Sequence, residues 1–286
     1  WQPHDCGTMR DIMSEAVPTP ADASPPQPVR QWDPAAPLRL LAMDAGTSEL
    51  TVAVGQWQAG RAGAGEAPTV QAYAGAGSAQ SSATLIPVVL QLLQQAGLAL
   101  PQLDAIAFGA GPGSFTGLRT ACSVAQGLAL GAELPLLPLD TLMVTAEDYR
   151  SRHPLQPGDT VWALLDARMD EIYVAGWRWQ PLPDGAPHWE PLHDAVLARP
   201  EDLLAVPGLT ADARCAGNVQ AVYGERMPLQ VAHAMPVADA MLRLAPALLQ
   251  QGQAVDAAMA LPRYVRNKVA QTTAEREAAK AAAGKA

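Results

Sequence analysis

The chain has 286 residues, of which 49% are hydrophobic, and a formal net charge of −9. This length supports one or two domains, and no apolar run reaches the roughly 18 residues of a membrane-spanning helix. The negative charge makes the chain a poor candidate for gripping a nucleic acid alone, because free-standing nucleic-acid binders are usually basic. A place in a complex where another subunit supplies the basic surface stays open.

Residues 1–37 are rich in proline, alanine and charge and show no periodicity, which predicts a disordered extension. They lack the charged start and apolar core of a signal peptide. We predict no function for this segment.

The first ordered element is an apolar strand, Leu38 to Met43, and a second strand follows from Leu50 to Val54. The turn between them reads Asp44-Ala-Gly-Thr47, so the pattern predicts a hairpin. Asp44, Gly46 and Thr47 have two interpretations. They could hold a Mg²⁺-phosphate, or they could be ordinary turn formers whose side chains bond their own backbone.

Residues 55–80 are Gly/Ala-rich, with a weak strand at Val70 to Tyr73. An amphipathic helix is predicted next, from about Ser82 to Ala96, with Gly97 as its C-cap. Its apolar residues at helical spacing are Leu85, Val88, Val89, Leu92 and Leu93.

A strand from Ala105 to Phe108 is followed by the turn GAGPG and by a helix that begins at Ser114, a good N-cap residue. A strand, a Gly-rich turn and a helix N-terminus can bind an anion. However, the glycines of this turn, which include Gly111 and Gly113, match neither a Walker A loop nor a dinucleotide fingerprint. The alternative is a tight turn that lets the helix pack closely on its sheet.

That helix carries small residues every four positions, at Gly117, Ala121, Ala125 and Ala129. They share one face, which lets another helix approach closely. An internal packing face and a subunit interface are equally compatible with this stripe.

Leu134 to Leu139 is the next predicted strand and Thr141 to Tyr149 the next helix, an alternation typical of an α/β sandwich with a mixed sheet. After a boundary at 153–159, a second hairpin is predicted, with strands Val161 to Leu165 and Ile172 to Trp179. Like the first, it has an aspartate, Asp166, where its first strand ends.

The remaining predicted elements are a loop, a short helix, a strand that ends at Gly217-Asn218, a long helix and a tail. They cover 181–191, 200–204, 214–216, 237–251 and 271–286 respectively.

No metal or nucleophilic site emerges from the spacing of histidines and cysteines. The five histidines form no HxxxH pair, and the three cysteines are far apart and fit a reducing cytosol. No Ser-His-Asp or Cys-His arrangement is supported. Asp44 and Asp166 are the carboxylates of interest, because both end predicted buried strands.

Four segments together resemble the bacterial TsaB (YeaZ) family. They read LLAMDAGTSELTVAV, AIAFGAGPGSFTGLRTACSVAQGLALGAELPLLPLDTL, VWALLDARMDEIYVAGW and PRYVRNKVA. The resemblance covers about residues 38–270, and the GPGSFTGLR block is highly specific. It implies the ASKHA fold (actin-like ATPase, RNase H-like), with similar α/β subdomains at 38–150 and 151–270.

The resemblance also implies a role. TsaB-like proteins pair with a TsaD-type subunit, which holds the metal and the active site. With a TsaE-type ATPase, the complex forms N6-threonylcarbamoyladenosine next to the anticodon of ANN-reading tRNAs. The chain is then a cytoplasmic, non-catalytic scaffold that needs no metal or cofactor and meets tRNA only in the complex. A homodimer is expected when the partner is absent.

In this family the first two long helices bundle with the partner's matching pair. The contact residues that we predict on these helices are Leu85, Val89, Leu92, Gly117, Ala121 and Ala125. Asp44-Ala-Gly-Thr47 departs from the family pattern towards the DxGT phosphate loop of nucleotide-binding relatives, so weak ATP or ADP binding stays open. The residues that would form vestigial nucleotide loops are Asp44, Gly46, Thr47, Gly111, Gly113, Ser114, Asp166 and Gly217. The alternative function is an independent ASKHA-type ATPase or kinase.

Overall fold

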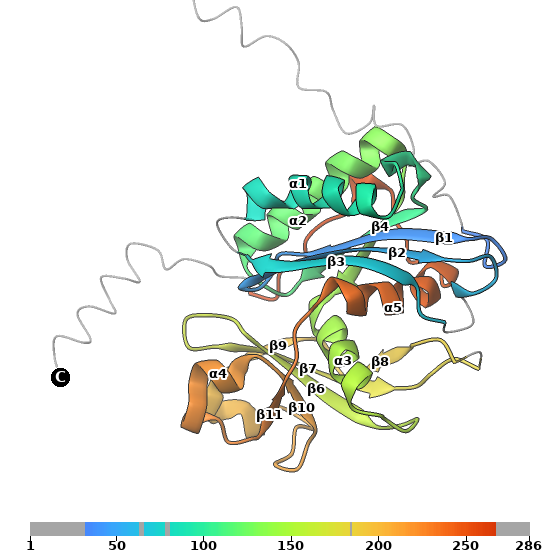
Figure 1. Cartoon of the computed structure of the whole chain (residues 1–286). Coiled ribbons are helices and arrows are strands. Elements are labelled where there is room, and N and C mark those ends of the chain that lie inside the picture. The colour runs from blue at the N-terminus through green and yellow to red at the C-terminus, as the bar shows by residue number, and fades with distance from the viewer. Residues whose placement is uncertain (1–31, 63–65, 78–80, 184, 267–286) are drawn as a thin grey trace, which may run out of the picture.

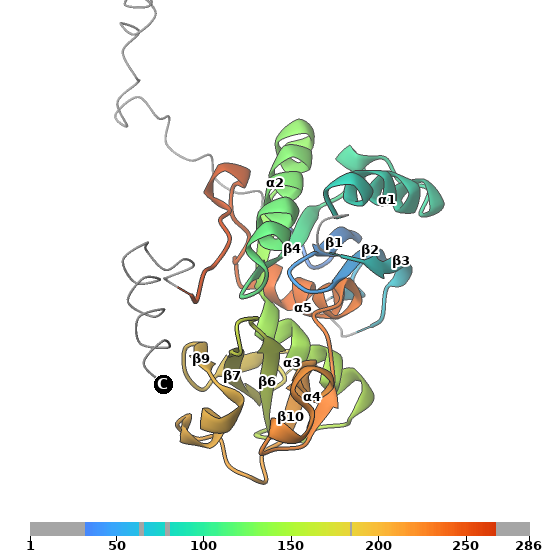
Figure 2. The same cartoon turned by 90° about the vertical axis from the view of Figure 1, so that its left-hand side faces the viewer.

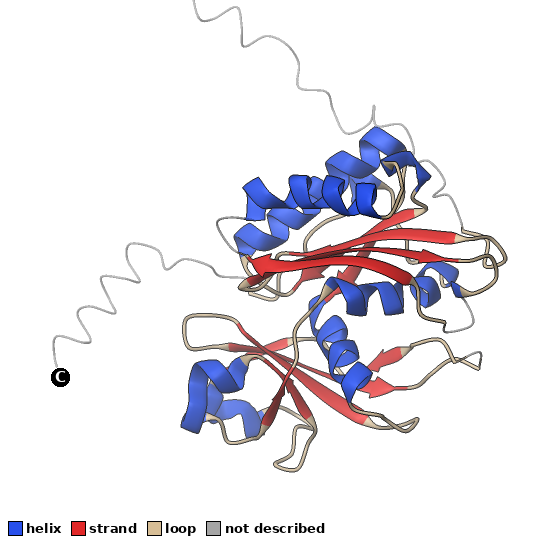
Figure 3. Ribbon diagram, viewed as in Figure 1, coloured by secondary structure: helices blue, strands red, loops and turns tan. Residues whose placement is uncertain are grey.

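The computed structural model describes residues 32–62, 66–77, 81–183 and 185–266. Two mixed β-sheets lie one above the other, with helices outside and between them (Figures 1 and 3). The predicted tail 271–286 and residues 1–31 of the predicted extension lie outside the described residues. Within the described part, no helix is long and apolar enough to cross a membrane.

The first sheet has the strand order β3-β2-β1-β4-β5. Its strands are β1 (Leu38–Asp44), β2 (Glu49–Trp57), β3 (Thr69–Ala76), β4 (Ala105–Gly111) and β5 (Leu136–Asp140). β1 pairs antiparallel with β2 and parallel with β4. The central strands β1 and β4 are buried along almost their whole length, which explains their continuous apolar sequences.

The second sheet has the order β11-β10-β6-β7-β8, and β9 also pairs with β7. Its strands are β6 (Thr160–Asp166), β7 (Ile172–Trp179), β8 (Trp189–Pro191), β9 (Val196–Ala198), β10 (Cys215–Gly217) and β11 (Val231–His233). β6 pairs antiparallel with β7 and parallel with β10. The neighbourhood of β6 therefore repeats that of β1, as the two predicted hairpins indicated.

Five α-helices accompany the sheets in the described residues. They are α1 (Ser81–Gln95), α2 (Phe115–Ala132), α3 (Thr141–Arg152), α4 (Val219–Tyr223) and α5 (Ala238–Gln250). α1 and α2 cover the outer face of the first sheet, whereas α3 and α5 lie between the two sheets (Figures 1 and 2). Because α5 packs on β1 and β2, the C-terminal half of the chain contributes to the layer under the first sheet.

Short 3₁₀ helices complete the described part, at Leu100–Gln102, Pro200–Ala205, Gly224–Arg226 and Ala257–Met259. The predicted strands and long helices are present, and Gly97 ends α1 with φ +67°, as expected of a C-cap glycine. The expected N-cap at Ser114 needs correction. Ser114 occupies the N-cap position of α2, but its hydroxyl makes no capping hydrogen bond.

Candidate functional site

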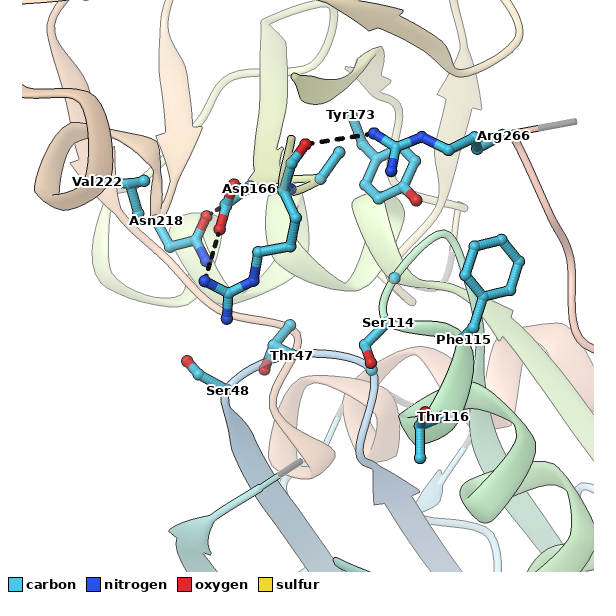
Figure 4. A pocket seen from close by; sticks show the side chains of 14 residues that line it. Thr47, Ser48, Ser114, Phe115, Thr116, Asp166, Tyr173, Asn218, Val222 and Arg266 are labelled. Carbon is cyan, nitrogen blue, oxygen red and sulfur yellow. Dashed lines mark hydrogen bonds and ion pairs between the residues drawn. The ribbon is translucent and has the colours of Figure 1, made fainter. Parts of the chain in front are cut away.

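A cavity of about 480 Å³ lies between the subdomains, at the carboxyl ends of β1 and β6 (Figure 4). We call it the cleft. Its lining comes from the turn after β1, the start of α2, the turn after β6 and two later segments. The lining residues are Gly46, Thr47, Ser48, Gly113, Ser114, Phe115, Thr116, Asp166, Ala167, Arg168, Tyr173, Asn218, Val222 and Arg266. Five of the eight predicted nucleotide-loop residues are therefore brought together here.

Close backbone contacts position the start of α2 against the first hairpin turn. The Ser114 N–H donates to the Gly46 carbonyl at 2.7 Å. A Cβ at Gly113 would lie 2.7 Å from the same carbonyl oxygen, and a Cβ at Gly117 would lie 1.8 Å from the Ala45 oxygen. Glycine is required at both positions because any side chain would collide with backbone. The tight-turn interpretation of this loop is therefore correct, whether or not the loop also binds a ligand.

The other three predicted loop residues do not line the cleft. Gly111 ends β4 with φ +116°, and Gly217 ends β10 just before Asn218. Asp44 is only 1% exposed and is not among the residues that line the cleft. Its Oδ1 accepts the Gly46 N–H at 3.0 Å, whereas its Oδ2 is buried without a hydrogen-bond partner in the described residues.

Burial raises the pKa of Asp44 to about 7, against the opposing effect of the Gly46 hydrogen bond. Removal of a carboxylate from water without an opposite charge disfavours its ionised form. Near neutral pH Asp44 is thus only partly ionised, and it does not face the cleft. These properties do not suit a ligand for a Mg²⁺-phosphate.

Asp166 lies at the cleft, but its carboxylate is already engaged by neighbours. Its Oδ1 accepts the Arg168 N–H at 2.9 Å and the Tyr223 hydroxyl at 3.0 Å, and its Oδ2 lies 3.4 Å from the Arg168 guanidinium. The Asp166 N–H in turn donates to Asn218 Oδ1 at 2.8 Å. Asp166 therefore serves as an anchor for the second hairpin turn.

This second turn has a strained backbone. Arg168, Met169 and Asp170 are three consecutive non-glycine residues in the left-handed region, with φ of 60°, 55° and 63°. Such residues persist only where the surroundings hold them. Arg226 forms two bonds to Asp170, at 2.6 and 2.9 Å, and Arg266 donates to the Arg168 carbonyl at 3.3 Å. Sequence reasoning missed this strain, since none of the three residues is a glycine or an asparagine.

The cleft has features that suit an anionic group. The N-terminus of α2 and the Arg168 guanidinium, which also pairs with Asp166, favour negative charge there. Among the described residues, no group of three His, Cys, Asp or Glu side chains could hold a metal ion.

The predicted partner-contact residues are buried in the chain's own core. The side chains at 85, 89, 92, 121 and 125 are at most 3% exposed, and Gly117 packs on Ala45. The structure thus supports the internal packing interpretation of the small-residue stripe on α2.

The outer side of α1 and α2 is apolar and almost uncharged. α1 contains no charged residue, and α2 contains only Arg119. Ile86, Leu90 and Leu130 are 45%, 56% and 64% exposed. Exposed small residues alternate with them on α2 at Ser123, Gly127 and Gly131. We call this surface the helix face. The sequence does indicate this surface, because α1 has no charged residue although one side of a surface helix normally faces water.

The comparisons with known proteins agree with this architecture. A model of the family described as "TsaD: tRNA N6-adenosine threonylcarbamoyltransferase" matches residues 75–182. The tRNA threonylcarbamoyladenosine biosynthesis protein TsaB of Escherichia coli is 33% identical over 241 residues, which cover 82% of this chain and 96% of that protein. The Haemophilus influenzae protein of the same name is 44% identical over 91 residues, 32% of this chain and 37% of that protein.

Two solved structures from Pseudomonas aeruginosa are similar over most of this chain. One, described as similar to peptidase YEAZ, has 33% identity and a TM-score of 0.65, and covers 80% of this chain and 100% of its own. The other, YeaZ, has 34% identity and a TM-score of 0.63 and covers 79% and 99%. With the two-sheet α/β fold, which is ASKHA-like, these similarities show that the chain belongs to the TsaB (YeaZ) family.

Proposed function

We propose that this chain is the non-catalytic partner subunit of a TsaD-type threonylcarbamoyltransferase. In this role it is required to form N6-threonylcarbamoyladenosine next to the anticodon of ANN-reading tRNAs. Support comes from membership of the TsaB family, whose relatives carry tRNA threonylcarbamoyladenosine biosynthesis in their names. The family model that matches residues 75–182 is that of the transferase itself.

The observation that carries the proposal is the helix face. Charged residues make up 16% of the chain, yet α1 and α2 expose leucine and isoleucine with one arginine between them. Exposed apolar surface of this kind marks protein–protein contact in a soluble fold. Gly127 and Gly131 have nothing near a built Cβ, so a partner helix has room to approach closely.

The remaining partners follow from the same role. A TsaE-type ATPase joins the complex, and tRNA reaches this chain only through the complex, since a net charge of −9 opposes binding to phosphates. A homodimer through the helix face forms when the partner is absent, because a bare apolar face tends to find another copy. The complex acts in the cytoplasm.

We further propose that the chain needs no metal or cofactor and that ATP or ADP binds weakly, if at all, in the cleft. The α2 N-terminus and Arg168 favour a phosphate, but Asp44 is buried and Asp166 is engaged by Arg168 and Tyr223. Titration calorimetry with Mg²⁺-ATP tests this point. Tight binding with turnover would favour the independent ATPase or kinase.

The main test is complex formation with the TsaD-type subunit of the same organism, measured by size-exclusion chromatography with light scattering. The wild type should form a stable complex, and Leu90→Glu should weaken it. Leu204→Glu is a matched control, because Leu204 is 48% exposed on a 3₁₀ helix far along the chain. Absence of a complex with the wild type would overturn the proposal.

A further inference from the structure

A segment near the C-terminal end of the described residues, residues 256–266, lies along α2. We call it the strap. Figure 2 shows it on the side of α2 opposite to α1. The Gln126 amide of α2 donates to the carbonyls of Ala257 and Ala260, at 3.1 and 3.0 Å. At the other end, the Arg263 N–H donates to the Ala110 carbonyl and its guanidinium lies 3.0 Å from Asp140. The strap is thus attached to the chain's own core at both ends.

The strap buries its small residues and exposes its large apolar ones. Ala257 and Ala260 are 4% and 1% exposed, whereas Met259 and Leu261 are 61% and 71% exposed. Burial of methionine and leucine would remove far more apolar area from water than burial of alanine. A segment that only covers the chain's own core would be expected to bury its large apolar side chains, and the strap does the opposite.

The C-terminal half of α2 shows a similar pattern at its outer side. It turns Ala125 and Ala129 towards the core and leaves Leu130 exposed, whereas Leu118 near the start of the helix is buried. Two adjacent elements therefore hold large apolar side chains in water on a backbone that is attached to the core. Preorganised apolar side chains are what an interface uses as anchors, because little conformational entropy is lost on binding.

An aromatic cluster continues this surface at the other end of α2. The Tyr264 ring lies 4.9 Å from the Phe115 ring, and its hydroxyl accepts the Arg119 Nε–H at 3.0 Å. The Arg119 guanidinium has no carboxylate partner among the described residues. It is the charged residue of the two helices, so it can meet a carboxylate supplied from outside.

The exposed large apolar side chains are concentrated on this side of the molecule. Of the nine in the described residues, six lie on α1, α2 and the strap, and a seventh, Met169, contacts Arg266 at the end of the strap. The six are Ile86, Leu90, Leu130, Met259, Leu261 and Tyr264. The helix face and the strap therefore both adjoin α2, which contacts α1 and the strap.

We propose that the strap is a second docking element for the TsaD-type partner, which binds the helix face and the strap together. This inference rests on the proposed function. The partner surface that fits is apolar opposite Met259 and Leu261 and carries a carboxylate opposite Arg119. The interface therefore reaches beyond the helix pair and includes a segment about 130 residues further along the chain.

The test compares full-length variants by titration of each with the TsaD-type subunit. Leu261→Glu and Met259→Glu should each raise the dissociation constant at least about tenfold, which is the effect of losing one apolar anchor. Leu204→Glu should change it less than about twofold. All three side chains are exposed, so equal melting temperatures will show that the variants are folded.

The outcomes separate this inference from the proposed function. If Leu90→Glu weakens binding and neither strap variant does, the strap proposal is overturned and the proposed function stands. If the wild type does not bind the subunit, both are overturned. If Leu261→Glu instead disrupts a homodimer and leaves partner binding unchanged, the occupant of the strap is a second copy, and the proposal is wrong.

Discussion

The two hairpin turns at the cleft have the same topology and opposite chemistry. Each follows a central strand that is paired antiparallel on one side and parallel on the other. Asp44 at the first turn is buried, with one carboxylate oxygen unpartnered. Asp166 at the second turn is bonded by Arg168 and Tyr223. Asp44 does not line the cleft, whereas Asp166 lines it with its carboxylate already bonded.

The helices that follow the matching parallel strands differ as well. β4 leads into α2, which has 18 residues, whereas β10 leads into α4, which has only 5. A long helix presents an outer face several turns long, and a helix of one turn cannot. In the described residues, the first half of the fold thus presents a long outer helix surface after its parallel strand and the second half does not. This difference is the basis on which we propose a docking surface in the first half.

The largest expected effect concerns the first turn and pH. Because the pKa of Asp44 is about 7 in the folded chain and near 3.8 in the unfolded chain, the folded state binds more protons between these values. The free energy of unfolding should therefore fall as pH rises from about 4 to 7. At about 1.4 kcal/mol per pKa unit, the loss is at most about 4 kcal/mol. Urea unfolding across this range measures it.

Asp44→Asn should remove this fall, because the amide does not titrate. The variant should be less pH-dependent than the wild type between pH 4 and 7 and the more stable of the two above pH 7. Equal slopes for both proteins would show that Asp44 is ionised in the folded chain.

Gly117→Ala should cost about 3 kcal/mol, since its Cβ would lie 1.8 Å from the Ala45 carbonyl oxygen and force α2 away from the first turn. Gly127→Ala is the matched control in the same helix, because its Cβ meets open space. The control should stabilise the chain by up to about 1 kcal/mol, the helix propensity difference. Similar losses in both variants would contradict the tight contact.

Arg266→Ala tests the second turn. The Arg266 side chain is 10% exposed, and its guanidinium pairs with Glu171 and donates to the Arg168 carbonyl. Its removal should cost about 2 kcal/mol and speed hydrogen exchange at 168–171, where strained residues lose a support. Arg178→Ala, which removes an exposed ion pair with Glu190, should cost less than about 1 kcal/mol. Unchanged exchange would mean that the contacts of Asp166, Tyr223 and Arg226 hold the turn without Arg266.

Much of this fold could be predicted because its long elements have strong local signals. The second hairpin is an example. Val161 to Leu165 and Ile172 to Trp179 are unbroken apolar runs around a polar turn, and the strand Ile172–Trp179 has the predicted bounds. By contrast, β8, β9 and β11 have three residues each, which is too short for any periodicity to register.

The site was harder to predict because tertiary packing decides which side of a helix faces the sheet and which groups surround a side chain. α2 carries two stripes of small residues, one through Ala121 and Ala125 and one through Ser123 and Gly127. Spacing alone cannot tell which stripe faces the sheet, and the stripe predicted to contact a partner is the one that is buried in this chain. Similarly, Asp44 and Asp166 end equivalent strands, and only their neighbours in space give one a raised pKa and the other two bonding partners.

The smallest expected effect separates the two turns. Tyr223→Phe removes a hydroxyl that lies 3.0 Å from both Asp166 Oδ1 and the Glu171 carbonyl, and one hydrogen bond is worth about 1 kcal/mol. The pH dependence attributed to Asp44 should not change, since Tyr223 shares no partner with Asp44. The double variant with Asp44→Asn should therefore be additive within about 0.5 kcal/mol. A larger coupling energy would mean that the turns sense each other across the cleft, and their different chemistry would then have to be explained as one site.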